Sequence, residues 1–234
     1  MHKKFLFILI VASYAVMGYS QKKDPLRSVD FQDQKKWVDS IYDSMTLKEK
    51  VGQLFVAQLM TKNDNSAQIY KQISEYKIGG IILSNGTPKK TAEVTNKMQS
   101  LSDVPLLIGI DGEWGINMRI DSTPKFPWNM SLGALKDNGY IEKIGKSIGN
   151  HSKRMGIHIN FAPVVDINTN PINPIIGNRS YGEDKYNVTS KALSFTKGMQ
   201  EEGVLACAKH FPGHGDTSKD SHKTLPTIGF NKKR

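Results

Sequence analysis

The sequence has 234 residues, of which 38% are hydrophobic and 23% are charged. This composition excludes a disordered or fibrous chain and is typical of one ordinary globular domain with a sizeable core. The formal net charge of +10 makes an anionic polymer worth considering as a partner. However, the basic residues form only short, scattered runs without interleaved aromatic residues, so we expect no nucleic-acid binding.

The first twenty residues have the pattern of a secretory signal peptide. A positively charged start precedes an apolar stretch over residues 5–17, and Gly18 and Ser20 supply small residues at the cleavage positions. The alternative is an N-terminal membrane anchor, but the apolar stretch is shorter than the roughly 20 residues that a span needs. We therefore expect cleavage after Ser20, export to the periplasm or the extracellular space, and no stable membrane span afterwards. Cys207 is the only cysteine, so the fold has no internal disulfide.

Residues 21–36 are polar without a clear period and are expected to form a lead-in segment. Thr46 and Glu49 then have the spacing of a capping box at the start of a helix. Apolar runs of strand length follow at 54–60, 78–84, 104–111, 157–167 and 204–211. Helices are predicted between them, near 66–77, 89–102, 138–155 and 185–202.

Near-continuous apolar strands that alternate with helices predict an α/β fold, in which helices cover both faces of a parallel sheet. Polar residues stand at the C-terminal ends of three of the strands: Asp111, Asp166, and Lys209 with His210. In a closed barrel these ends converge on one mouth, whereas an open doubly wound sheet uses a glycine-rich turn after its first strand. The first run lacks such a turn, so we predict a (β/α)8 TIM-type barrel.

The length of the chain indicates that this barrel is incomplete. An eight-stranded barrel needs about 250 residues, whereas five predicted strands already extend to residue 211 and only residues 225–230 are available to begin a sixth. We therefore expect residues 37–234 to form the N-terminal portion of a barrel, truncated after about strand five or six.

The segment KHFPGHGDTSKDSH, residues 209–222, concentrates titratable side chains in one loop. A solvated loop rich in turn-forming residues is one interpretation. A zinc site is another, although the spacings fit no recurring ligand pattern. We favour acid/base chemistry, because Asp220 and His222 are two residues apart and point to the same side of an extended chain. The carboxylate then holds one imidazole nitrogen while the other exchanges a proton.

This segment resembles the signature of family 3 glycoside hydrolases, in particular their β-N-acetylglucosaminidase branch. Four other segments resemble those of the family in the same order: KIGGIILS, PLLIGIDGEWGINMR, NFAPVVDIN and IGNRSYGED. The resemblance covers about residues 35–230. One departure is the segment GEWGINMR after Asp111, where many members have a glycine pair and an arginine, although Arg119 falls at the expected position.

The resemblance implies a set of residues that bind the non-reducing sugar. Asp111 matches the carboxylate that binds sugar hydroxyls, and Arg119 and Arg179 match arginines near that sugar. Lys209 and His210 match the pair that hydrogen-bonds the same ring. Asp166 is not included in this set, because a carboxylate at that position can simply brace the mouth of the barrel.

The resemblance also implies a retaining mechanism that removes terminal β-linked N-acetylglucosamine from cell-wall or oligosaccharide substrates. His222 matches the acid/base, with Asp220 as its partner, and the nucleophilic aspartate of the family lies beyond residue 234. We therefore expect this chain to be inactive by itself and to need no metal or cofactor. Two alternatives remain open: a β-glucosidase-type member, which takes its acid/base from a later domain, and a non-catalytic carbohydrate-binding module, which has no need of the Asp220–His222 pair.

Overall fold

A computed structural model describes residues 30–229 of the chain. The expected signal peptide and most of the expected lead-in segment lie outside these residues. The chain divides after Met45 into two compact units, which are described separately. Within residues 30–229, no helix has the length and apolar character required to cross a membrane.

The first unit contains helix α2, Phe31–Ser44. The expectation that regular structure begins only after Lys36 was therefore wrong. None of the residues of α2 is buried, although Trp37, Val38, Ile41 and Tyr42 recur at the spacing of one helix face. A surface ion pair one turn apart, between Lys35 Nζ and Asp39 Oδ2 at 2.5 Å, supports the helix locally.

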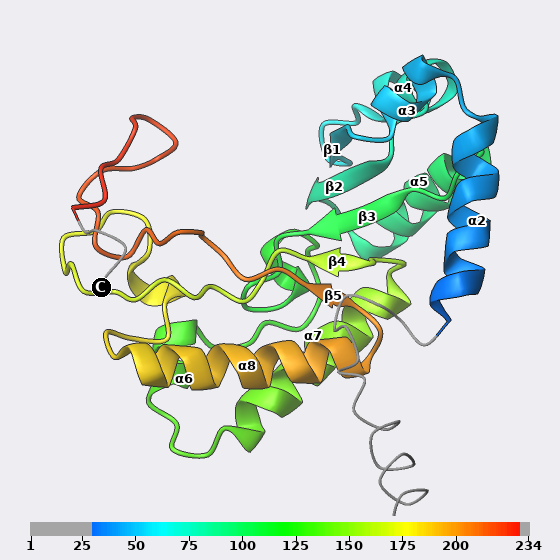
Figure 1. The fold of residues 1–234 in the computed structure, drawn as a ribbon. Helices are drawn as coiled ribbons and strands as arrows, with labels where there is room; N and C mark the ends of the chain where they lie inside the picture. Colours follow the sequence, from blue (N-terminus) through cyan, green and yellow to red (C-terminus); the bar gives the residue numbers. More distant parts are fainter. Residues whose placement is uncertain (1–29, 230–234) are drawn as a thin grey trace, which may run out of the picture. The chain divides into compact units, whose positions relative to one another are not determined.

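The second unit is built on a parallel sheet of five strands in the order β1-β2-β3-β4-β5. The strands are β1 (Val56–Met60), β2 (Gly80–Asn85), β3 (Leu107–Ile110), β4 (Ile159–Asn160) and β5 (Leu205–Ala206). Figure 1 shows them side by side in chain order, with a helical segment between consecutive strands. The prediction of an α/β fold with a parallel sheet is confirmed.

The helices of this unit lie close to the predicted ranges. They are α3 (Leu47–Gly52), α4 (Ser66–Tyr76), α5 (Pro88–Leu101), α6 (Asn129–Gly133), α7 (Gly139–Arg154) and α8 (Lys185–Glu201), with short 3-10 turns η1 (Ile116–Met118) and η2 (Gly177–Arg179). The predicted capping box is present: Thr46 Oγ1 accepts a hydrogen bond from Glu49 N at 3.3 Å, and Thr46 N donates to Glu49 Oε2 at 2.8 Å.

Two predicted strands are much shorter in the structure. The apolar run over residues 157–167 forms only the two-residue strand β4, and residues 204–211 form only β5. Pro163 lies within the first run and has no N–H to donate to a ladder. Residues 162–167 instead form a loop, joined to the chain after β5 by a bridge between Val164 and Lys209. Residues 225–229 form no strand.

The core of the second unit consists of two clusters of buried side chains. The first joins strands β1–β3 to α4 and α5, through residues such as Leu59, Ile81, Ile108, Ile73 and Met98. The second lies between α7 and α8 and includes Ile148, Phe195 and Met199. The two helices pack closely at Gly198. A Cβ atom at this position would lie only 2.0 Å from the carbonyl oxygen of Glu142, so the contact requires glycine.

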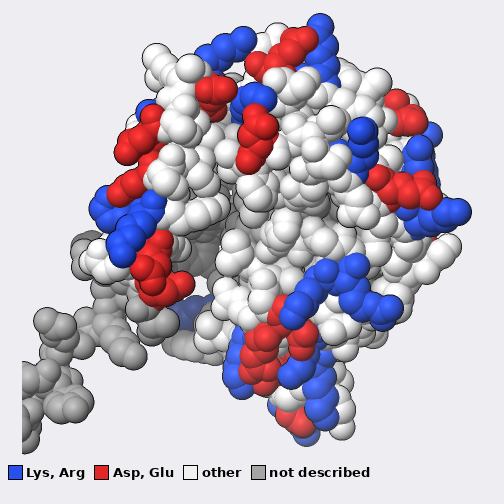
Figure 2. All heavy atoms as spheres, turned by 90° about the vertical axis from the view of Figure 1, so that its right-hand side faces the viewer, with Lys and Arg blue, Asp and Glu red and all other residues white. Residues whose placement is uncertain are grey.

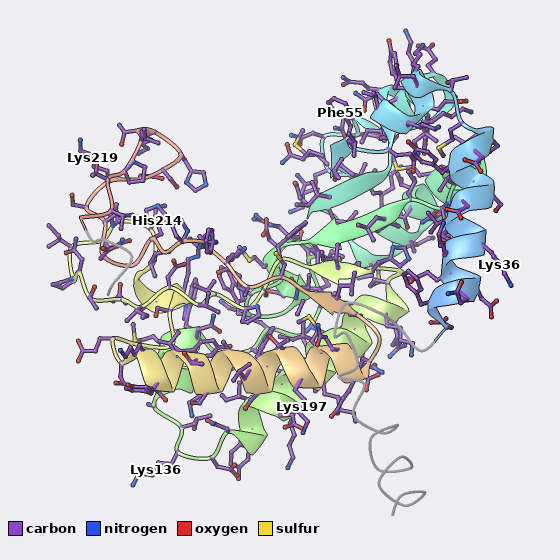
Figure 3. The ribbon with its side chains drawn as sticks, in the orientation of Figure 1. Lys36, Phe55, Lys136, Lys197, His214 and Lys219 are labelled. Carbon is purple, nitrogen blue, oxygen red and sulfur yellow. The ribbon has the colours of Figure 1, made fainter. Side chains whose placement is uncertain are left out.

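Apolar side chains are also exposed along the open edge of β1. Leu54, Phe55 and Val56 are more than half exposed, and Figure 3 shows Phe55 beside this strand. A groove of about 600 Å³ runs next to them, lined by residues that include Val51, Phe55 and Tyr76. Elsewhere, basic and acidic side chains are interspersed over the face drawn in Figure 2.

Candidate active site

The polar residues at the C-terminal ends of the strands meet, as predicted. Asp111 directly follows β3, and Lys209 follows β5. Lys209 Nζ donates to Asp111 Oδ1 at 2.8 Å, and Arg119 Nη2 donates to Asp111 Oδ2 at 3.1 Å. The structure therefore places three of the predicted sugar-binding residues in direct contact.

An asparagine on the neighbouring strand fixes the backbone at this point. Asn160, which is completely buried on β4, accepts from Gly112 N at 2.8 Å and donates to Gly112 O at 3.1 Å. A Cβ atom on Gly112 would lie 3.1 Å from the side-chain nitrogen of Asn160, so the close approach favours glycine. This clamp holds the carboxylates on both sides of Gly112, those of Asp111 and Glu113, at the end of β3.

Glu113 is a site residue that the sequence interpretation missed. Its side chain has no exposed surface and accepts two hydrogen bonds from Arg179, one from Nε at 2.9 Å and one from Nη2 at 2.8 Å. Lys209 Nζ lies 2.7 Å from the same carboxylate. Burial raises the pKa of Glu113, but hydrogen bonds and positive charge from Arg179 and Lys209 outweigh it and hold that pKa below its ordinary value.

Asp111 carries its negative charge for a related reason. Its partial burial raises the pKa, whereas Lys209 and then Arg119 lower it more strongly, so the pKa of Asp111 lies below its ordinary value. Each of its two oxygens accepts only one of these hydrogen bonds. Asp111 therefore keeps lone pairs available for the hydroxyl groups of a ligand.

Asp166 holds the segment that carries His210. This buried carboxylate accepts from His210 N at 3.2 Å and from His214 N at 2.6 Å, and its Oδ2 atom lies 2.6 Å from His210 Nδ1. The side chain of Asp166 has no exposed surface. The peptide bond that joins Lys209 to His210 is cis. Asp166 therefore braces the site. This structural role is the reason for which Asp166 was left out of the predicted sugar-binding residues.

These neighbours also assign the proton of the imidazole. An ionised carboxylate can only accept, so His210 Nδ1 carries the hydrogen that points to Asp166. On the other side, Arg179 Nη2 lies 3.2 Å from His210 Nε2, and a guanidinium can only donate. The contacts therefore fit the tautomer of His210 that carries its hydrogen on Nδ1 and accepts at Nε2.

The site thus has two tiers, which we call the front residues and the rear carboxylates. The front residues have partly exposed side chains: Asp111 (26%), Lys209 (15%), Arg179 (20%) and His210 (35%). The rear carboxylates, Glu113 and Asp166, are fully buried and each holds front residues in place. A ligand rich in hydroxyl groups suits the front residues, because they offer both acceptors and donors.

Asp220 and His222 lie together on the loop that follows β5. His222 Nδ1 is 2.8 Å from Asp220 Oδ1, and His222 N donates to the same oxygen at 2.9 Å. The predicted contact is confirmed, but its expected origin in an extended chain was wrong. Thr224 N and Lys223 N both donate to Asp220 O, so this segment is a turn. The hydrogen bonds from the backbone and side chain of His222 lower the pKa of Asp220.

The structure does not join this pair to the front residues. Within the described part of the chain, no hydrogen bond or ion pair connects Asp220 or His222 to Asp111, Lys209 or Arg179. The side chain of His222 is 75% exposed, and Figure 3 shows Lys219, from the same loop, well away from the strands. Residues 30–229 also contain no group of three or more His, Cys, Asp or Glu side chains placed to hold a metal ion.

Known proteins resemble this chain in sequence and in structure. Residues 46–234 match the Glycosyl hydrolase family 3 N terminal domain. Beta-hexosaminidase A of Pseudoalteromonas piscicida is 40% identical over 178 residues, which cover 70% of this chain and 30% of that protein. Beta-N-acetylglucosaminidase/beta-glucosidase of Cellulomonas fimi is 32% identical over 186 residues, 80% of this chain and 33% of that protein.

A solved structure gives the same result. The family 3 beta-N-acetylglucosaminidase of Paenibacillus sp. str. FPU-7 superimposes with a TM-score of 0.74 at 40% identity, over 81% of this chain and 38% of that protein. The chain thus spans about a third of the length of the two curated relatives. Because the family match extends over most of its residues, the chain belongs to glycosyl hydrolase family 3.

Proposed function

We propose that this protein is a retaining β-N-acetylhexosaminidase, which removes terminal β-linked N-acetylglucosamine from a glycan. One observation carries the proposal: Lys209, which pairs with Asp111 among the front residues suited to a sugar, and the Asp220–His222 pair occur on the same stretch of chain after β5. The relatives support it, since two of them are named as acting on N-acetylglucosamine or hexosamine linkages.

The two groups of residues have different parts in the proposed reaction. The front residues bind the non-reducing sugar, with Asp111 accepting from its hydroxyl groups and Lys209 and Arg179 donating to them. His222 protonates the oxygen of the leaving group and then, as a neutral imidazole, takes a proton from water to release the sugar. Asp220 fixes the imidazole through Nδ1 and leaves Nε2 for the proton transfer.

The loop must move for this reaction, because the Asp220–His222 pair makes no contact with the front residues in the structure described. Gly213, at the base of the loop, has φ +136°, a conformation that side chains rarely adopt. We propose that the loop closes over the bound sugar and brings His222 to the glycosidic oxygen. The nucleophile is an aspartate that the family places on a later strand, outside residues 1–234.

A β-glucosidase-type activity is the second candidate, because the Cellulomonas fimi relative carries both names. The two candidates differ in the group at C2 of the sugar. Comparing aryl β-N-acetylglucosaminide with aryl β-glucoside, hydrolysed by the product of the complete reading frame, decides between them. Faster hydrolysis of the glucoside would contradict the N-acetylglucosamine assignment. Recovery of the protein in a periplasmic or culture fraction would support export, which is also part of the proposal.

The substitution His222→Ala tests the proposed acid/base. Loss of a general acid should slow a substrate with a poor leaving group by about 10² to 10⁴-fold, but should affect an activated aryl glycoside much less at the first step. Lys219→Ala is the matched control on the same exposed loop and should leave both rates unchanged. Equal losses on both substrates would argue against His222 as the acid. Turnover by the 234-residue chain alone would contradict a nucleophile outside it.

A further inference from the structure

We infer that Glu113 is a positioning residue for sugar recognition: it aims Arg179 and Lys209 at the ligand and keeps them from occupying Asp111. The inference deepens the proposed function and rests on it for the identity of the ligand. Glu113 itself has no surface at the site, since its side chain is fully buried. It therefore acts through the residues that it holds.

The contacts of Glu113 restrict both cations to one orientation. Its two oxygens accept from Nε and Nη2 of Arg179 in a bidentate pair, at 2.9 and 2.8 Å. Such a pair fixes the plane of a guanidinium as well as its position. Arg179 Nη1 additionally donates to Ile175 O at 3.2 Å, so little rotational freedom remains for this side chain.

Lys209 is fixed in a similar way. Its ammonium group has three hydrogens, of which one points to Asp111 at 2.8 Å and one to Glu113 at 2.7 Å. The third is left for another acceptor. Because the side chain of Lys209 is 15% exposed, a hydroxyl group of a bound sugar can reach it. Glu113 thus determines where this remaining hydrogen points.

Charge balance explains why a carboxylate is needed behind the cations. The permanent charges in contact at the site are those of Asp111, Glu113 and Asp166 against Arg119, Arg179 and Lys209. Without the charge of Glu113, Asp111 is the remaining carboxylate bonded to Lys209, and it is one of the two carboxylates, with Asp166, whose charges still act on Arg179. Additional hydrogen bonds to Asp111 would consume the lone pairs that the sugar hydroxyl groups need.

The test uses the whole 234-residue chain with the substitution Glu113→Gln, which keeps the size of the side chain and removes its charge. Glu142→Gln is the matched control. Glu142 also accepts from a cation at 2.8 Å, from Lys197, but this pair is exposed on the surface of α7 and α8. Two quantities are measured on each variant: protection of the Arg179 Nε–H against hydrogen exchange by NMR, without ligand, and the Kd for N-acetylglucosamine.

We expect the Arg179 Nε–H to be protected in the unsubstituted chain and in Glu142→Gln, and to exchange rapidly in Glu113→Gln. The Kd should rise about tenfold or more in Glu113→Gln, as expected when a charge-assisted hydrogen bond is lost, and should not change in Glu142→Gln. If Glu113→Gln does not fold, Glu113→Asp retains the charge and should show partial protection and intermediate affinity.

The outcomes separate this inference from the proposed function. Unchanged protection of Arg179 in Glu113→Gln, or an unchanged Kd, would overturn the role assigned to Glu113. The unsubstituted chain could also fail to bind the sugar while Arg179 protection still depends on Glu113. That result would count against the sugar as the ligand, but it would support the conclusion that Glu113 fixes Arg179.

Discussion

Replacing Asp166 with asparagine should destabilise the fold strongly, although the change removes no atoms from the core. The carboxylate accepts three hydrogen bonds, two at Oδ2 from His210 and one at Oδ1 from His214 N. An amide has only one oxygen, so its NH2 group must face at least one of these donors. If the oxygen stays beside His210, the His214 N–H is left buried against another donor.

The magnitude follows from these losses. A hydrogen bond to a charged group contributes about 1.5–3 kcal/mol, and a buried donor without an acceptor costs about 1–3 kcal/mol. The expected decrease in the free energy of unfolding is therefore about 3–5 kcal/mol. For a domain of this size it corresponds to a fall in Tm on the order of 10 °C.

Urea unfolding followed by circular dichroism measures this change. Asp121→Asn is the matched control, because Asp121 pairs with Lys62 at 2.6 Å with about half of both side chains exposed. It should change the free energy of unfolding by less than about 1 kcal/mol. An Asp166→Asn chain as stable as this control would refute the reasoning.

Two further predictions concern acid stability and the open sheet edge. Because the folded-state pKa of Glu113 lies below its ordinary value of 4.5, its charge stabilises the fold above that pH and this contribution is lost as the pH falls through the folded-state pKa. The free energy of unfolding of Glu113→Gln should therefore approach that of the unsubstituted chain in urea titrations as the pH falls below 4.5, and a constant difference would contradict this assignment. Separately, Phe55→Glu should reduce self-association of the chain in sedimentation velocity while changing the unfolding free energy by less than about 1 kcal/mol, because Phe55 is 60% exposed beside an apolar groove. If the unsubstituted chain remains monomeric at roughly 100 μM, the edge of β1 does not mediate self-association.

The sequence was sufficient to predict the alternation of strands and helices in the second unit, because buried parallel strands and amphipathic helices leave strong apolar patterns. It also placed Asp111 and Lys209 at the C-terminal ends of two strands that were expected to converge, and the 2.8 Å contact between them confirms that they meet. Strand lengths were less predictable. Residues 162–167 have the apolar composition of a strand but form a loop. Instead of extending β4, this loop is hydrogen-bonded to the chain after β5 around Lys209.

The rear carboxylates could not be identified with the same certainty, for a physical reason. Glu113 lies in an irregular segment after β3, where no period indicates which side chains point inward, and its partner Arg179 is 66 residues away in the sequence. A buried carboxylate also conflicts with the usual exposure of acidic residues. The available signal was the excess of cations near the predicted site, since Arg119, Arg179 and Lys209 together need more than one carboxylate. Asp166 could be noticed, but its role as a brace depends on contacts with His210 and His214.

The division between front residues and rear carboxylates has a consequence for how this protein can change over time. A substitution at His210 alters the surface that a sugar meets, while Asp166 and Glu113 stay buried behind it. Substrate preference can therefore change during evolution while the protein remains folded. It can also be redesigned through a library of variants restricted to the partly exposed positions. Substitutions of Asn160 or Asp166 would instead remove variants from such a library through loss of stability, whatever sugar was used for selection.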